Sequence, residues 1–315
     1  MDLAEAVSKA RPVAATKLAS GFSWPEIPRW HDGAFWFSDM YNHCLLRLDA
    51  DGTPEKVVDA SNRKPLSPEA GSDEPGQTEV VLGGAGWLPD GRLIVNSMHE
   101  RLVLVWDGTT LDLYADLRPL AISSINDMVV DADGRAYISQ LGFDLFAGEE
   151  PRDSEMLVVE PDGSAHAVAD VGEFSCGNGI AITADGSRLL IAEVMANRVS
   201  VMDRAADGTL SNRRDFTETP FLPDGICLDE QGGLWAGMPG SGYVARFEEG
   251  GVMTDAIALP MDQAMGVACV LGGEDRSTLY IAAGLEVFDW AKSRDEGLGT
   301  IWTAQTDYTA GASRN

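Results

Sequence analysis

Four polar residues stand immediately before apolar runs, in surroundings that are otherwise small or hydrophobic: Glu26, Asn126, Asn178 and Asp224. Each precedes a turn glycine by nearly the same distance, seven residues for Glu26 and eight for the other three. Two carboxylates balance the charge of one divalent cation, and two amides add neutral oxygen ligands. Because Ca²⁺ accepts irregular cages of oxygen atoms, these residues predict a metal site with Ca²⁺ as the preferred ion.

Other ions and a structural interpretation compete with this prediction. Mg²⁺, Mn²⁺ and Zn²⁺ are alternatives, although zinc favours histidine or cysteine ligands, and the four histidines of the chain show no ligand spacing. An Asn or Asp before a strand can also bond its own backbone in an Asx-turn. That interpretation suits any one of the four residues alone, whereas four matching offsets favour a shared site.

The elements that must position these residues recur along the chain. A short turn, most often Asp-Gly, is followed by an apolar run at residues 31–37, 89–95, 132–138, 184–190, 230–236 and, in degenerate form, 273–281. Asp-Gly between β-rich runs indicates hairpins, and a second strand and turn follow most copies. Units of about 50 residues with several short strands are typical of propeller blades. The sequence predicts an all-β, six-bladed β-propeller, a single domain over residues 1–315.

The ends and loops of this propeller can also be predicted. Residues 1–12 are expected to be flexible or to form a short helix, and either Val13–Ala19 or Thr300–Gln305 to complete a blade begun at the other terminus. Ser67–Glu79 is expected to form an exposed acidic loop and Phe143–Asp153 an insertion. The first strand of a propeller blade lines the central channel, so the four polar residues should converge there. A β-solenoid or a sandwich explains six units of this length less well.

Composition limits the function. The 315 residues are 44% hydrophobic and 23% charged, which excludes a mainly disordered chain, and the formal net charge is −27. Such an acidic surface repels nucleic-acid phosphates and anionic membranes, and no apolar run approaches the roughly 18 residues of a membrane-spanning helix. The beginning of the chain lacks the apolar segment of a secretory signal. The four cysteines are far apart, so we expect free buried thiols and a cytoplasmic protein.

The motifs around the four polar residues resemble the gluconolactonase, luciferin-regenerating enzyme and senescence marker protein family. The resemblance extends from about Gly21 to Ala283, and any one of its motifs alone is weak. The motifs that carry it are Pro25–Pro28, Ile125–Asp131, Asn178–Ala181, Leu190–Val199 and Pro223–Ile226.

The resemblance implies a six-bladed propeller with one divalent metal at the top of its channel, and hydrolysis of lactones, other cyclic esters or organophosphates. By position, Glu26, Asn178 and Asp224 match the metal ligands, and Asn126 either completes the metal shell or touches substrate. Bound metal would polarise the ester carbonyl, with Asp224 as general base or as nucleophile. Asp127 would orient the ligands from behind, unless it is an ordinary turn aspartate.

Two positions depart from the family pattern and bear on the substrate. Ser124 stands where the sugar-lactone branch usually carries an arginine, which puts a phosphorylated or polyhydroxylated substrate in doubt, and Ile27 stands where a glycine is usual. Apolar residues at the expected channel mouth favour an apolar or aromatic lactone or ester, with His99 as an acid or a substrate contact. The candidate substrate residues are Trp24, Met40, Tyr41, Met98, His99, Phe143, Met195, Met238 and Met265.

Two non-hydrolytic alternatives remain. Synthases resembling strictosidine synthase share the propeller but generally lack the metal shell, so the complete set of oxygen donors argues against them. A small-molecule binding protein or a scaffold of the WD-repeat type would share the fold alone, and the Trp-Asp and Gly-His signatures of that scaffold are missing here. The sequence leaves the substrate, the native metal and the oligomeric state open.

Overall fold

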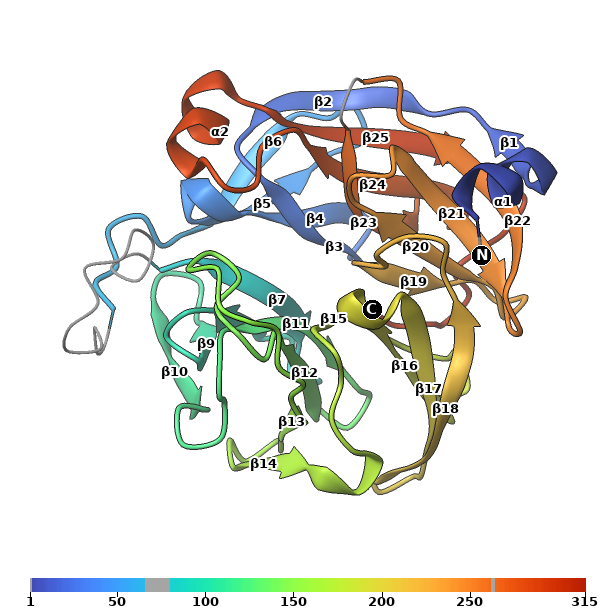
Figure 1. The fold of residues 1–315 in the computed structure, drawn as a ribbon. Coiled ribbons are helices and arrows are strands. Elements are labelled where there is room, and N and C mark those ends of the chain that lie inside the picture. The colour runs from blue at the N-terminus through green and yellow to red at the C-terminus, as the bar shows by residue number, and fades with distance from the viewer. Residues whose placement is uncertain (1, 66–79, 262–263) are drawn as a thin grey trace.

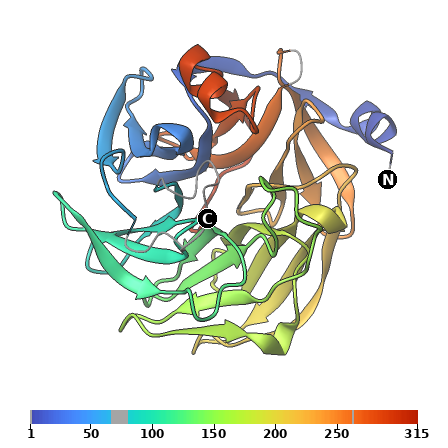
Figure 2. The same cartoon turned by 60° about the vertical axis from the view of Figure 1, so that its left-hand side comes forward.

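Six small sheets stand radially around a central channel in the computed structural model, which describes residues 2–65, 80–261 and 264–315 (Figures 1 and 2). The prediction of an all-β, six-bladed propeller is confirmed. The described residues contain two α-helices, α1 (Leu3–Lys9) and α2 (Trp290–Glu296), and three single 3₁₀ turns, η1 (Met40–Asn42), η2 (Ala169–Val171) and η3 (Val194–Ala196). Within the described residues, neither α-helix is long and apolar enough to cross a bilayer.

Each blade is an antiparallel sheet whose strands follow one another from the channel outward. Blades 1 to 3 are β3 (Pro25–His31), β4 (Ala34–Asp39), β5 (Cys44–Leu48), β6 (Pro54–Asp59); β7 (Leu82–Trp87), β8 (Leu93–Ser97), β9 (Leu102–Trp106), β10 (Leu111–Asp116); and β11 (Ile125–Val130), β12 (Ala136–Gln140), β13 (Met156–Val159), β14 (Ala165–Val168). Blades 4 to 6 are β15 (Gly177–Ile182), β16 (Arg188–Glu193), β17 (Arg198–Arg204), β18 (Leu210–Glu218); β19 (Ile226–Leu228), β20 (Leu234–Met238), β21 (Tyr243–Glu248), β22 (Val252–Ala258); and β23 (Met265–Gly272), β24 (Thr278–Gly284), β25 (Gly299–Gln305).

The two ends of the chain close the propeller together. The strand β2 (Thr16–Phe22) pairs antiparallel with β25 and becomes the outer strand of blade 6. This confirms that the two termini share a blade, a closure that leaves no unpaired edge between first and last blades. The expected short helix is present as α1, but the segment is not simply flexible. The strand β1 (Arg11–Val13) pairs parallel with β22 as a fifth strand of blade 5, and Arg11 forms an ion pair with Asp255.

Apolar side chains fill the spaces between neighbouring blades. The clusters combine residues of adjacent blades, for example Leu190 of blade 4 with Leu234 of blade 5. The innermost strands of successive blades contact one another in a closed ring, β3 to β7, β11, β15, β19, β23 and back to β3. The four cysteines are free and buried, as expected. This packing fixes the ends of the inner strands relative to one another.

The segment from Thr306 to Asn315, called the tail here, crosses the end of the channel where the inner strands finish. The backbone of Arg314 pairs with Ile182 at the end of β15, and Ser313 Oγ donates to the carbonyl of Leu228 at the end of β19 (2.8 Å). The C-terminus lies at the centre of the ring in Figure 2. We call this the lower end of the channel, and the end where inner strands begin the upper end.

Two predicted loops have different outcomes. The expected acidic loop at Ser67–Glu79 lies outside the described residues. The expected insertion at Phe143–Asp153 lies between β12 and β13 and contains no strand. Its turn is held by the carboxylate of Asp144, which accepts hydrogen bonds from the backbone N–H groups of Phe146 and Ala147 (3.0 Å each).

Candidate active site

Three of the predicted ligands lie at the upper ends of inner strands where the ladder is irregular, and the fourth, Asp224, lies two residues before β19. The register shifts between Glu26 and Arg29 in β3, between Ile125 and Met128 in β11, and between Gly177 and Ile180 in β15. A β-bulge inserts an unpaired residue and turns its side chain away from the regular alternation. For Glu26, Asn126 and Asn178, the repeated offset seen in the sequence therefore corresponds to a repeated irregularity of the inner strand.

Glycine at position 179 lets blades 4 and 5 approach closely at this level. A side chain there would collide with the backbone of the next blade, because its Cβ would lie 2.6 Å from the Asp224 carbonyl oxygen. Instead the N–H of Gly179 donates to that oxygen (3.3 Å). The neighbouring side chains then meet, and the amide of Asn178 hydrogen-bonds the carboxylate of Asp224.

Glu26 shares this space. Its carboxylate accepts from Trp24 Nε1 (3.2 Å) and from the backbone N–H of Ile27 (3.3 Å). Glu26, Asn178 and Asp127 line one small cavity on the channel axis. Desolvation raises the pKa of Glu26 to about 7, with a further rise from the charge of Asp127.

The carboxyl group of Asp224 is perturbed in the same direction. Desolvation raises the pKa of Asp224 well above its usual range, and the charges of Glu26 and Asp127 raise it further. A hydrogen bond from Asn178 opposes this shift only in part. Within the described chain, no arginine or lysine forms an ion pair with either carboxylate. The site therefore concentrates negative charge that protein groups leave uncompensated.

These donors fit a hard divalent cation. Carboxylate and amide oxygens are the ligands that Ca²⁺ prefers, and a cation would relieve the repulsion between Glu26 and Asp224. Within the described residues, no group of three or more His, Cys, Asp and Glu side chains is placed to hold a metal. The amides of Asn126 and Asn178 would therefore be needed beside the two carboxylates. The part played by Asn126, which lies buried at the bulge of β11, stays a prediction.

Unlike the carboxylates of Glu26 and Asp224, the carboxylate of Asp127 has an arginine partner. It forms a buried ion pair with Arg29, whose guanidinium also donates to the carbonyl oxygens of Ala85 (2.9 Å) and Met128 (2.6 Å). The second carboxylate oxygen of Asp127 accepts from the N–H of Ile180 (3.2 Å). Arg29 and Asp127 thus link blades 1 to 4 directly beneath the candidate ligands. This placement agrees with an orienting role for Asp127, which stays a prediction.

Blade 2 carries no donor at the equivalent position, and the reason is steric. A Cβ on Gly83 would lie 2.6 Å from Met98 Cγ, and a Cβ on Gly84 would lie 2.4 Å from the backbone nitrogen of Met128. Glycine is needed at both positions because β7 packs directly on β11. The site is therefore asymmetric, because blades 1, 3, 4 and 5 supply polar groups whereas blade 2 packs closely against blade 3.

Ile27 shows why a small residue is usual beside Glu26. Its backbone has φ of 55°, in the left-handed region that a β-branched side chain rarely adopts. The side chain is 6% exposed and packs among the inner strands. The strain belongs to the bulge that points Glu26 into the channel.

A series of contacting aromatic rings extends from Glu26 at the upper end of the channel. Trp24, which donates to Glu26, stacks with Tyr41 at 6.2 Å between ring centroids, and Tyr41 stacks with Trp290 at 4.8 Å. Trp290 in turn stacks with His99 at 5.9 Å and meets Phe146 edge-on at 5.2 Å. We call these five residues the aromatic wall.

An exposed apolar side chain, Phe288, lies at the end of the aromatic wall. Phe288 contacts Phe146 edge-on at 6.4 Å and is 67% exposed. The Tyr41 hydroxyl donates to the carbonyl of Val287 (2.6 Å), which ties the segment before α2 to blade 1. Trp24 and Tyr41 are buried, whereas His99, Phe146 and Trp290 are half-buried. The accessible part of the wall, together with Phe288, suits a flat, hydrophobic ligand.

The other predicted substrate residues are placed differently. Trp24, Met40 and Met98 belong to one buried cluster between blades 6, 1 and 2. Phe143 packs in a small cluster with Cys176. Three residues take separate positions: Met195 is exposed, Met265 is half-buried at the start of β23, and Met238 is fully buried in the core between blades 4 and 5, away from any surface.

Sequence reasoning missed several residues at this site. Phe146, Phe288 and Trp290 come from segments between the repeats, where no periodicity points to them; a Phe-Asp-Trp sequence after the last apolar run was the available signal. Arg29 was detectable as a charged residue inside an apolar strand. Its partner Asp127 is distant in sequence, so the ion pair between them could not be predicted.

Comparison with known proteins agrees with the geometry. The chain is 28% identical to regucalcin from Xenopus laevis over 87% of this chain and 88% of that protein, and 26% identical to gluconolactonase from Zymomonas mobilis over 84% and 78%. The structure of a calcium-binding protein, regucalcin, from Agrobacterium tumefaciens superposes with a TM-score of 0.73 at 18% identity, over 96% of this chain and 97% of that one. Residues 24–284 match the SMP-30/Gluconolactonase/LRE-like family. On these sequence and structural grounds the chain belongs to that family.

Proposed function

We propose that this protein is a divalent-metal-dependent hydrolase that opens an apolar or aromatic lactone or a related ester. Relatives named gluconolactonase and pentonolactonase support lactone hydrolysis, and relatives named regucalcin, one described as calcium-binding, support Ca²⁺. The substrate is accordingly a small molecule.

The observation that carries the proposal is the meeting of Glu26, Asn178 and Asp224 from three blades in one polar space. The two carboxylates sit in surroundings that raise the pKa of both. An acid in a cleft whose pKa is strongly perturbed by desolvation and by a neighbouring charge is a candidate for a functional site. The buried acids Asp131, Glu193 and Asp229 have arginine partners, whereas these two do not.

The residues at the upper end of the channel have different proposed roles. Glu26, Asn126, Asn178 and Asp224 would hold the cation, and Asp127, fixed by Arg29, would keep the inner strands in register beneath them. A cation bound there supplies polarisation of the ester carbonyl and stabilisation of the developing oxyanion. Asp224 either accepts a proton from the attacking water or attacks the carbonyl carbon itself. The aromatic wall holds the apolar part of the substrate and excludes water from it.

The substrate class can be tested with a matched pair of lactones. We expect an aromatic lactone such as dihydrocoumarin to be hydrolysed with a higher kcat/KM than glucono-1,5-lactone, because the aromatic wall binds only the first. Trp290→Leu should lower kcat/KM for the aromatic lactone by about 2- to 10-fold, since an aromatic contact contributes about 0.5–1.5 kcal/mol. A preference for the sugar lactone would refute the apolar assignment.

Metal dependence has its own test. Treatment with a chelator should abolish turnover of alkyl lactones, in which the leaving group is an aliphatic alkoxide, and added Ca²⁺ should restore it. Turnover of an alkyl lactone that survives complete removal of divalent metal, verified by elemental analysis, would contradict the proposed chemistry.

A further inference from the structure

Ser124 and His99 form a hydrogen-bonded pair at the rim of the channel. The serine Oγ lies 2.9 Å from Nδ1 of the imidazole, and both side chains are half-buried. The backbone holds the two residues together, because the N–H of Ile125 donates to the carbonyl of Met98 (3.2 Å). A hydroxyl bonded to an imidazole is the basic unit of serine-based nucleophilic catalysis.

The imidazole is held rigidly. Its ring lies between Trp290, which stacks on it at 5.9 Å, and Phe146, which meets it edge-on at 6.3 Å. Burial lowers the pKa of His99, and the nearby charge of Asp144 opposes that shift without cancelling it. A neutral imidazole can accept a proton, as a general base must.

The pair also lies beside the substrate position rather than in the core. His99 is part of the aromatic wall, and Ser124 is two residues from Asn126. Ile125, between them, is fully buried in the cluster between blades 2 and 3. Ser124 and His99, by contrast, are half-buried. A ligand that reacts with Ser124 would have to lie against the wall with its carbonyl group at the serine hydroxyl.

We propose that Ser124 is a nucleophile activated by His99, and that it accepts acyl groups from aryl esters without a metal. The Oγ–C bond forms as the Ser124 proton moves to His99 Nδ1, and the carbonyl π electrons move to oxygen. When the carbonyl re-forms, the bond to the aryl oxygen breaks and His99 returns the proton to the departing phenol. Water then attacks the acyl-serine by the same route, which releases the acid and restores Ser124.

This activity goes beyond the proposed function and does not depend on it. The metal-dependent route uses Asp224 and its neighbours, whereas the serine route uses two residues that are not candidate ligands. The metal-dependent route and the serine route can therefore fail independently, and an experiment on chelator-treated protein tests the serine route alone.

Phenylmethanesulfonyl fluoride is a suitable probe, because its phenyl ring fits the aromatic wall and it sulfonylates activated serines. We expect chelator-treated wild-type protein to gain one label, and peptide fragmentation to place it on Ser124. Ser124→Ala should stay unlabelled. His99→Phe, which keeps an aromatic ring against Trp290, should be labelled at least about 100-fold more slowly, as expected for loss of a general base.

The control is the adjacent serine. Ser123 donates to a backbone carbonyl and has no histidine partner, so Ser123→Ala should be labelled at the wild-type rate. Absence of label from the wild-type protein, a label on any other residue, or an unchanged rate in folded His99→Phe would overturn the proposal. Because the label is located in the unmodified chain, the test does not depend on any variant folding.

Discussion

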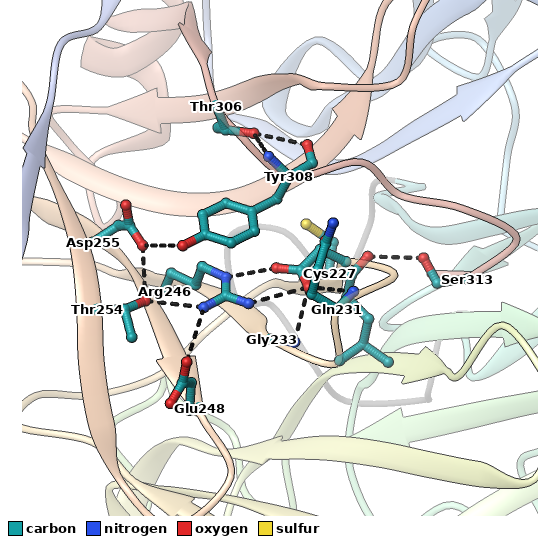
Figure 3. A network of polar contacts seen from close by, with 12 residues as sticks. Cys227, Gln231, Gly233, Arg246, Glu248, Thr254, Asp255, Thr306, Tyr308 and Ser313 are labelled. Atoms are coloured by element: carbon teal, nitrogen blue, oxygen red, sulfur yellow. Dashed lines mark hydrogen bonds and ion pairs between the residues drawn. The ribbon is translucent and has the colours of Figure 1, made fainter.

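The two ends of β19 carry one aspartate each, and the two side chains have opposite surroundings. Asp229, at the lower end, accepts from the N–H groups of Gln231 (3.0 Å) and Gly233 (2.9 Å) and forms an ion pair with Arg246 (2.6 Å). Figure 3 shows the network around Arg246, which also reaches Thr254 and Glu248. Asp224, at the upper end, has an amide partner and two neighbouring negative charges.

The same contrast recurs in other blades. Asp131, at the lower end of β11, is paired with Arg135 and Arg204. Glu193, which lies opposite Gly177 at the upper end of blade 4, is paired with Arg198 and Arg213. These acids are satisfied by protein groups, whereas Glu26 and Asp224 are not, and a charge left in this state is costly unless a ligand compensates it. The difference separates structural acids from candidate functional ones.

The largest expected effect is on turnover at the upper end. Asp224→Asn should lower kcat for the lactone by at least about 100-fold, because it removes the base or nucleophile. The melting temperature of the metal-free protein should stay the same or rise, since the substitution removes an uncompensated negative charge. Steady-state kinetics and thermal unfolding in chelator test both parts. A variant with near-normal kcat would remove Asp224 from the mechanism.

At the lower end the effect should fall on stability instead. Asp229→Asn leaves the guanidinium of Arg246, which is 2% exposed, without its main counter-charge. Breaking a buried pair by removing one partner costs about 3–5 kcal/mol, to be measured as the free energy of unfolding in urea. Turnover per folded molecule should be unchanged. Loss of activity without loss of stability would erase the distinction between the two aspartates.

Metal binding should distinguish the same two positions in a thermal shift experiment. Ca²⁺ at about 100 times its dissociation constant should stabilise the wild-type protein by about 2.7 kcal/mol, because a ligand that binds only the native state favours it. Asp229→Asn should show the same increment on a lower baseline, and Asp224→Asn little or none. Equal increments in the two variants would place the cation elsewhere.

The smallest expected effect concerns the tail. Ser313→Ala removes the hydrogen bond to Leu228 and should lower the free energy of unfolding by about 1 kcal/mol. Affinity for the cation should not change, because Ser313 does not line the cavity that Glu26 and Asn178 share. Chemical denaturation and calorimetry give the two quantities. A marked loss of affinity would show that the two ends of the channel are coupled.

Much of the fold could be predicted because turn chemistry is local. The glycines of the repeated turns need positive φ, as Gly134 and Gly186 show, so their spacing revealed the blades. The nearly equal offsets also predicted that Glu26, Asn178 and Asp224 lie close together. What could not be predicted depends on contacts between distant segments. The pairing of β1 with β22, the Arg29–Asp127 ion pair and the stacking of Trp290 on Tyr41 have no periodic signal.

Isothermal titration of metal-free protein with Ca²⁺ tests the central claim most directly, namely that axial oxygen donors from separate blades hold one cation. The wild-type protein should bind one equivalent per chain. The double variant Glu26→Gln, Asp224→Asn should bind none, while Asp229→Asn should still bind one. A wild-type protein that takes up no divalent cation, or a double variant that binds as tightly as wild type, would contradict the account.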